Sequence, residues 1–175
     1  GNLTLGTDKI ELKLPAGKGI NFSAYATSGN PSSNLLDDYE EGTFSPEYNT
    51  GSSSSAMFDS ATYRVTEGHY IKVGRLVTFT IRIECETITN PTSGASVIIT
   101  PLPFTQASGN VEGGAFFAYS KAVDSSNTGT VPVMLVGNAA ANLNMYNSNG
   151  TRYTVGASSQ DFTEPLHITG TYFAA

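Results

Sequence analysis

The chain has 175 residues, of which 39% are hydrophobic and 14% are charged, and its formal net charge is −6 at pH 7. One domain of this length buries roughly 70% of the surface that its unfolded chain exposes, so a self-sufficient core is feasible. The acidic balance argues against nucleic-acid binding, because counterion release needs clustered basic residues and the 9 Lys and Arg are dispersed. It also argues against an anionic membrane surface, and no apolar run is long enough to span a bilayer.

The first 38 residues differ in composition from the rest of the chain. Two short strand-like runs, Gly1–Gly6 and Ile10–Leu14, precede an apolar patch at Ile20–Phe22 and a linker rich in Ser, Gly and Asn. These runs hold too few apolar residues for a core, and isolated hairpins are marginal in water, so we expect them to pair with other chains or with upstream sequence. Residues 1–38 are therefore predicted to be a stalk and linker, and residues 39–175 the head domain. The initial Gly1 suggests a piece of a longer polypeptide or a processed product.

The clearest predicted strand runs from Arg75 to Glu86. Apolar and polar residues alternate along it, which is typical of a strand with one buried face. Gly74 between two β runs predicts a hairpin of His69–Val73 with Leu76–Cys85. We expect an apolar set to be buried and a polar set to lie on the opposite face: Val77, Phe79, Ile81, Ile83 and Cys85, against Thr78, Thr80, Arg82 and Glu84.

Further short apolar runs are separated by clusters of Ser, Gly and Asn, which favour turns. They predict strands at Ala95–Thr100, Val111–Tyr119, Val131–Val136, Asn142–Tyr146, Arg152–Val155 and Leu166–Phe173. About eight strands at this spacing, with no convincing helix, indicate an all-β fold. We predict an antiparallel β-sandwich head, jelly-roll-like, preceded by the short β stalk.

The acidic run from Asp37 to Glu41 is the first candidate for chemistry, because a hard cation such as calcium takes oxygen ligands. Its spacing is not that of a calcium-binding loop. We therefore favour a solvated or interchain-paired connector between stalk and head, and predict no metal and no cofactor.

Catalytic groups are also sparse in the sequence. Glycoside hydrolysis needs two carboxyl groups at a defined separation around a sugar cleft, whereas Glu84 and Glu86 share the outer face of one strand. His69 and His167 accompany no nucleophile motif and are interpreted as strand-surface or interface residues. Cys85 falls on an apolar face and is expected to be a quiet core residue. The sequence therefore predicts a protein that is not an enzyme.

Recognition of another molecule remains. Turn-rich loops that carry Tyr, Asn and Ser suit polar contacts with glycans or proteins. The best such segment runs from Tyr146 to Tyr153, although an ordinary hairpin tip would have the same composition. The predicted receptor-contact residues are Tyr146, Asn147, Asn149, Arg152 and Tyr153.

Four segments resemble recurring motifs of bacteriophage tail fibres and related receptor-binding fibres. Leu35–Pro46 resembles "LDDYEEGTWTP", with Phe44 in place of the usual Trp. Gly68–Val77 is similar to "GxYxKIGxxV", and Ile98–Thr105 is similar to "ITGLPFT", with Pro101 in place of Gly. Upstream, residues 17–24 resemble the "GNGIDFSA" turn of such fibres. The matches cover about residues 17 to 105 and contain no catalytic motif.

The resemblance implies a homotrimeric virion protein, the distal part of a tail fibre or spike, exposed outside the cell. We expect its N-terminal side to contact other tail or capsid proteins and its head to bind a host surface glycan or protein by multivalent, non-covalent contacts. A purely structural fibre or connector attached to tail or capsid, without receptor binding, is the alternative. A carbohydrate-active enzyme ranks last. No nucleic-acid partner and no membrane insertion are expected.

Overall fold

A computed structural model describes residues 20–21, 35–36, 38–49, 58–107, 113–120, 133–136, 143–146, 154 and 161–175 of the chain. Within these ranges the regular secondary structure is β-strand throughout, and no helix is long and apolar enough to cross a membrane. The strands are β1 (Ile20–Asn21), β2 (Leu35–Leu36), β3 (Tyr39–Phe44), β4 (Glu47–Asn49), β5 (Ser60–Val73), β6 (Leu76–Thr89), β7 (Ile98–Thr100), β8 (Gly114–Ser120), β9 (Val133–Val136), β10 (Leu143–Tyr146) and β11 (Leu166–Phe173).

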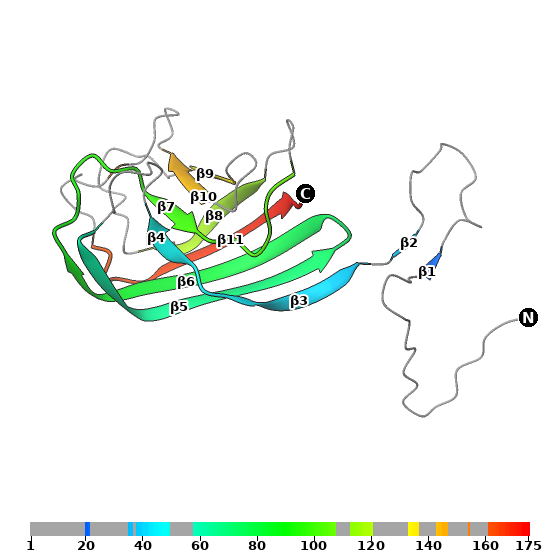
Figure 1. Cartoon of the computed structure of the whole chain (residues 1–175), viewed down its shortest axis with the longest axis horizontal. Helices are drawn as coiled ribbons and strands as arrows, with labels where there is room; N and C mark the ends of the chain where they lie inside the picture. Colours follow the sequence, from blue (N-terminus) through cyan, green and yellow to red (C-terminus); the bar gives the residue numbers. More distant parts are fainter. Residues whose placement is uncertain are drawn as a thin grey trace, which may run out of the picture.

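Nine strands form one antiparallel sheet in the order β3-β5-β6-β11-β8-β9-β10-β7-β4. The consecutive strands β3 and β4 stand at opposite ends of this order, so the sheet folds over on itself to make two layers (Figure 1). The strands β3, β5, β6 and β11 form one layer, here named the long-strand layer after the 14-residue strands β5 and β6, and β10, β7 and β4 cover it. The predicted all-β antiparallel sandwich is confirmed, whereas its jelly-roll character stays a prediction.

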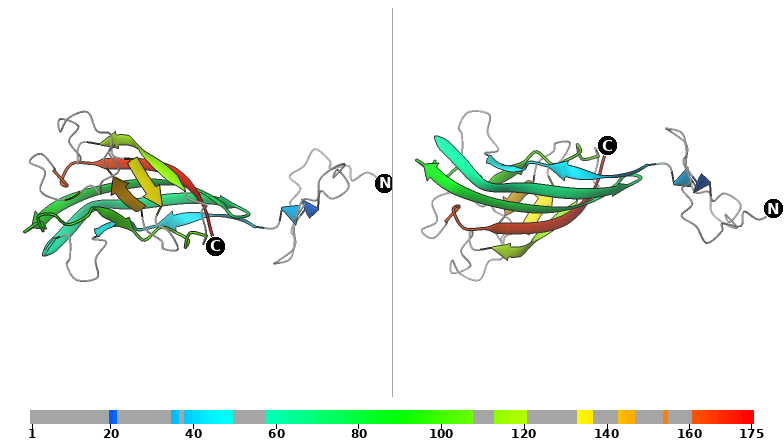
Figure 2. Two further views of the ribbon diagram at one scale, coloured as in Figure 1. Left: turned by 90° about the horizontal axis from the view of Figure 1, so that it is seen from above. Right: turned by 90° about the horizontal axis from the view of Figure 1, so that it is seen from below.

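The strands β1 and β2 pair with each other in a separate two-stranded sheet. Figure 2 shows this pair beyond the start of β3 in both views. The predicted strands Gly1–Gly6 and Ile10–Leu14 lie outside the described residues. The division into a stalk of residues 1–38 and a head of residues 39–175 stays a prediction.

The predicted hairpin is present and longer than expected. The strands β5 and β6 each have 14 residues and are joined by the two-residue turn Gly74–Arg75, in which Gly74 has a φ of 57°. A left-handed residue suits the twist of a tight hairpin, and Gly adopts it without steric cost. The part of β5 before His69 was not predicted, because an irregular register near Arg64 shifts its inward-facing positions and breaks the period of two.

The core lies between the two layers. The predicted apolar set of β6, from Val77 to Cys85, is 0–3% exposed, which confirms the expected buried face. It packs in one cluster with Ile99 of β7 and with Leu143 and Met145 of β10. The apolar positions of the alternating pattern along β6 therefore lie in the core.

The remaining strand predictions differ mainly at their ends. The predicted bounds Leu166–Phe173 agree with β11. The strands β7, β9 and β10 lie within their predicted runs, and β8 ends one residue beyond its predicted run. Of the predicted strand Arg152–Val155, the structure describes Thr154, which forms an isolated bridge with Ser96. Neither β3 nor β4 was predicted, because their charged and polar composition carries no alternating pattern.

Candidate functional site

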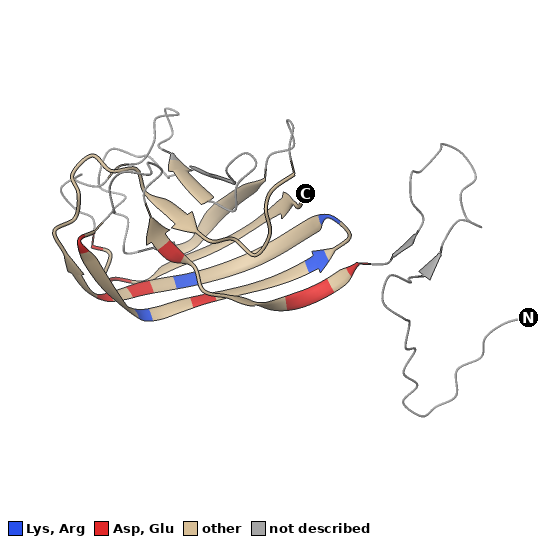
Figure 3. Ribbon diagram, in the orientation of Figure 1, with Lys and Arg blue, Asp and Glu red and all other residues tan. Residues whose placement is uncertain are grey.

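Two of the segments that carry the fibre resemblance lie side by side in the sheet. The acidic segment forms the edge strand β3, which pairs along its whole length with the end of β5. Lys72 of β5 forms a salt bridge with Asp38, and the Tyr70 hydroxyl donates a hydrogen bond to Glu40 at 2.6 Å. Figure 3 shows acidic residues of β3 next to basic residues around the β5–β6 turn.

Two glycines in these segments make room for aromatic rings. Gly42 pairs with Tyr70, and Gly68 pairs with Phe44. A Cβ on Gly42 would lie 2.8 Å from the Tyr70 hydroxyl oxygen, and a Cβ on Gly68 would lie 2.5 Å from the Phe44 ring. Both separations are too short for a real side chain, so each glycine allows the opposite ring to lie across the strand pair.

The third segment contributes Phe104 to the same place. Its ring meets Tyr70 edge to face, with centroids 5.1 Å apart, and Lys72 Nζ lies 5.3 Å from its centroid. The Tyr172 hydroxyl of β11 accepts from the Phe104 N–H and donates to the Phe104 carbonyl oxygen, both at 3.0 Å. Three segments that are far apart in sequence thus form one cluster that fastens β3 and the loop after β7 to the sheet.

The acidic run was expected to be a solvated or interchain-paired connector. Glu40 and Glu41 are exposed, which agrees with a solvated run, and pairing with other chains stays a prediction. The run continues into an edge strand of the head sheet, and its described carboxylates have partners within the chain. Asp38 pairs with Lys72, Glu40 accepts from Tyr70, and Glu41 accepts from the Tyr39 hydroxyl at 2.8 Å. Asp37 lies outside the described residues. Among the residues that the structure describes, no group of three or more His, Cys, Asp or Glu could hold a metal ion.

Glu84 is the exception to the predicted pattern of β6. It was expected on the exposed face, but it is 8% exposed, whereas Thr78, Thr80 and Arg82 are exposed as predicted. Arg64, which lies at the irregular register of β5, reaches one Glu84 oxygen at 2.6 Å, and Arg82 lies 3.6 Å from the other. The two guanidinium groups cover the Glu84 carboxylate, and both form ion pairs with it.

The predicted core thiol and two tyrosines are shielded from water. Cys85 is fully buried, as expected, and burial raises its pKa to about 12. Burial likewise raises the pKa of Tyr63 and of Tyr172 to about 12. The Tyr63 hydroxyl accepts a hydrogen bond from the Tyr48 N–H at 3.0 Å, which ties β5 to β4 in the other layer. These groups serve packing between the layers.

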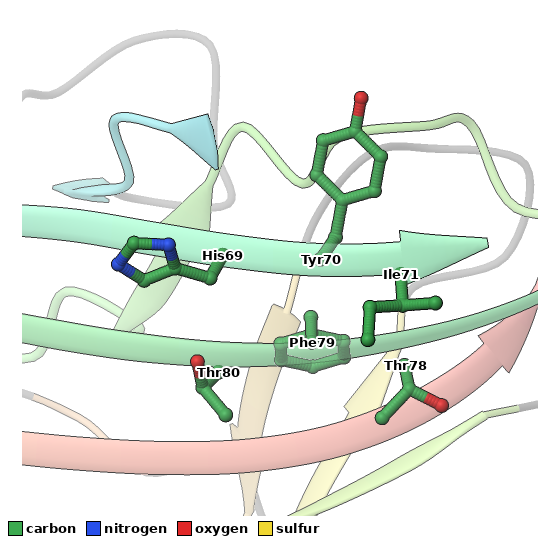
Figure 4. Close-up of a pocket in the computed structure, with 6 residues that line it drawn as sticks. All are labelled: His69, Tyr70, Ile71, Thr78, Phe79 and Thr80. Carbon is green, nitrogen blue, oxygen red and sulfur yellow. The ribbon is translucent and has the colours of Figure 1, made fainter. Parts of the chain in front are cut away.

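The side of the long-strand layer that points away from the core is here named the outward face. It consists of the outward-pointing residues of β3, β5, β6 and β11, and it continues onto β8, which pairs with β11. Figure 4 shows His69 and Ile71 of β5 beside Thr78 and Thr80 of β6 on this face, with Tyr70 pointing away from them. Both predicted surface histidines lie here, and the His167 ring meets the Tyr119 ring edge to face with centroids 5.5 Å apart.

A shallow groove of about 230 Å³ crosses the outward face between the two histidines. Its lining includes Glu67, Arg82 and Thr169 together with His69 and His167. The register places His69 opposite Thr80 and His167 opposite Arg82, so β6 separates the two rings. The sequence predicted that both histidines lie at a strand surface. It did not predict that they share one face of the sheet, because the pairing of β5, β6 and β11 is a tertiary property.

The predicted receptor-contact segment falls almost wholly outside the described residues. Asn147, Asn149, Arg152 and Tyr153 are not described, and Tyr146 is described as the last residue of β10, where its backbone pairs with Val133. The prediction therefore stands as a hypothesis about a segment that follows β10.

No protein-family model and no curated protein sequence matches this chain. Among solved structures, the chain is similar to the Dettilon tailspike protein (gp208), with a TM-score of 0.54 and 15% sequence identity. The likeness covers 77% of this chain and 23% of that one, so this chain spans about a quarter of the tailspike's length. At this identity the likeness is one of fold.

Proposed function

We propose that this chain is the distal part of a trimeric phage tail fibre or tailspike, whose head attaches to the host cell surface by non-covalent binding. The observation that carries the proposal is the likeness of the fold to a tailspike over 77% of the chain. The cluster built from Asp38, Tyr70, Lys72 and Phe104 supports it, because the segments of the fibre resemblance are those that join the first head strand to the sheet.

Multivalency supplies the mechanism. Several weak sites on one rigid tip bind more tightly than one, because the second and third contacts are intramolecular once the first has formed. The two-layer sheet is the rigid element, and loops at the ends of its strands can vary without disturbing the core.

The chemistry of the described groups supports binding rather than catalysis. Glu84, the best-placed candidate acid, is held between Arg64 and Arg82. The Cys85 thiol is buried, and its raised pKa keeps it protonated and weakly nucleophilic at neutral pH.

Adsorption competition tests the proposal. The purified 175-residue chain should bind host cells and block adsorption of the virus that carries it, and it should release no soluble saccharide from the cell surface. A folded oligomer that neither binds nor competes would favour the purely structural fibre or connector. Release of saccharide would instead establish an enzyme.

The segment Tyr146 to Tyr153 is the proposed receptor contact. Tyr offers amphipathic contact area at low entropy cost, and Arg152 can pair with anionic sugar or phosphate groups. We expect Tyr146→Ala, Arg152→Ala and Tyr153→Ala, singly and combined, to weaken cell binding with an unchanged melting temperature. Thr105→Ala, at an exposed position outside this segment, is the matched control. Full binding by the folded triple variant would remove the segment from consideration.

A further inference from the structure

Large apolar side chains are exposed on the outward face. Seven of them are 42–63% exposed, and each points away from the core from a strand of the long-strand layer or from β8. They are Tyr39, Ile71, Val73, Leu76, Phe116, Tyr119 and Phe173. These seven include every exposed large hydrophobic side chain among the described residues.

The strand register joins four of these residues into one row. Tyr39 lies opposite Val73, which lies opposite Leu76, which in turn lies opposite Phe173. The row therefore crosses β3, β5, β6 and β11 without a polar interruption. Next to it, Thr78 and Thr171 pair across β6 and β11, so short β-branched side chains leave the face even enough to meet another sheet.

The size of this surface fits a stable protein interface. With roughly half of each side chain exposed, and about 150–250 Å² of surface on a large aromatic, the seven residues present on the order of 700 Å². A standard interface buries about 800 Å² on each partner, so the seven side chains together approach the surface that one partner contributes.

The charges on the face favour a copy of the same chain as the occupant. Exposed Glu41 and Glu67 lie on it together with exposed Arg82, so the face carries both signs. An anionic polysaccharide would meet these carboxylates as well as Arg82. A second copy carries the same groups and can set its Arg82 against Glu67.

The position of the apolar row points the same way. Tyr39 begins β3 and directly follows the predicted stalk, residues 1–38. Copies held together by the stalk would bring their rows into reach of one another at the start of the head. We propose that the outward face, from the apolar row to Phe116 and Tyr119, is the surface through which copies of this chain pack together. This assignment rests on the proposed fibre for the number of copies.

A charge on the face tests the proposal. The full 175-residue chain should sediment as an oligomer, and Ile71→Glu should raise its dissociation constant at least tenfold while its far-UV circular dichroism stays unchanged. Thr105→Glu places the same charge at an exposed position off this face and should leave assembly unchanged. A wild-type chain that remains monomeric at micromolar concentrations would overturn the proposal.

A second measurement covers the case in which the stalk alone holds the copies together. A nitroxide on Thr78→Cys should be immobile, protected from a soluble relaxing agent and dipolar-broadened by its counterparts. The same label on Thr105→Cys should be mobile and accessible. Equal mobility and access at both positions in an oligomer would overturn the proposal.

Adsorption separates this inference from the proposed function. An oligomer with a covered face that does not bind cells contradicts host attachment and leaves the interface in place. A monomer that binds cells, and loses this binding in Ile71→Glu, would assign the face to the host surface and overturn the proposal.

Discussion

The two faces of the β5–β6–β11 layer come from the same alternating strands and end in different environments. On the inner face, Phe79 is 1% exposed and meets the Tyr172 ring with centroids 5.9 Å apart. On the outward face, Ile71 and Phe173 are large and apolar but remain exposed. Alternation along a strand separates its residues into two sets, but it does not determine what covers each set. The inner set is covered by the second layer of this chain.

The largest expected difference between the faces is the cost of truncation. Phe79→Ala removes a buried ring and leaves a cavity, so we expect a loss of about 3–5 kcal/mol in the free energy of unfolding. Thr80→Ala, the next residue along β6 and outward-pointing, should cost less than about 1 kcal/mol. Urea denaturation of both variants measures the difference. Similar losses would contradict the assignment of the inner face.

Hydrogen bonding gives a second contrast. Tyr172→Phe removes the hydroxyl that serves both the N–H and the carbonyl oxygen of Phe104, and should cost about 1–3 kcal/mol. Tyr119→Phe removes a hydroxyl from the exposed ring of the outward face and should change stability by less than about 0.5 kcal/mol. An unaffected Tyr172→Phe variant would show that the Phe104 loop is fastened in another way.

Alkaline pH should lower the stability of the fold through the buried ionisable groups of the core. The pKa of Tyr63 and Tyr172 is near 10 in the unfolded chain and about 12 in the folded one, and the pKa of Cys85 rises from 9.0 to about 12. The unfolded chain therefore loses these protons first. Their stabilising contribution is complete below pH about 9 and is lost as pH rises toward about 12.

The urea midpoint measured from pH about 8 to about 11 should accordingly fall. The double variant Tyr63→Phe, Tyr172→Phe should flatten this decline, with tyrosinate absorbance as an independent readout. A midpoint that is constant or rising over this range would contradict the burial of these groups.

The smallest expected effect concerns the edge of the sheet. Asp38→Asn removes the charge that pairs with Lys72, whose side chain is mostly buried while that of Asp38 is half exposed. Solvent screening limits the loss to about 0.5–1 kcal/mol. Added salt should shrink the difference from the wild-type chain. A salt-independent loss would show that packing of Lys72 on Phe104 matters more than the charge.

Particular residues show which features of the fold could be predicted from the sequence. The hairpin turn at Gly74 and the buried set from Val77 to Cys85 were predictable, because a period of two and a glycine between β runs are local signals. That Tyr39–Phe44 forms a strand was not predictable. Its carboxylates hide the alternation typical of a strand, and it becomes an edge strand because it pairs with β5. The proposed receptor-contact segment, Tyr146 to Tyr153, stays a prediction, because local composition does not say where such a segment lies in the fold.

The sequence by itself determined that the chain forms β-strands, which side of β6 is apolar, and that Cys85 belongs to the core. These properties follow from alternation, whose physical basis is the opposite direction of successive side chains in a strand. Tertiary structure alone decided that Glu84 is covered, because Arg64 reaches it from the neighbouring strand β5. It also decided that Asp38 pairs with Lys72, that Tyr70 meets Phe104, and that the apolar row from Tyr39 to Phe173 is continuous. Contacts between distant segments arise from strand order and register, which no local pattern encodes.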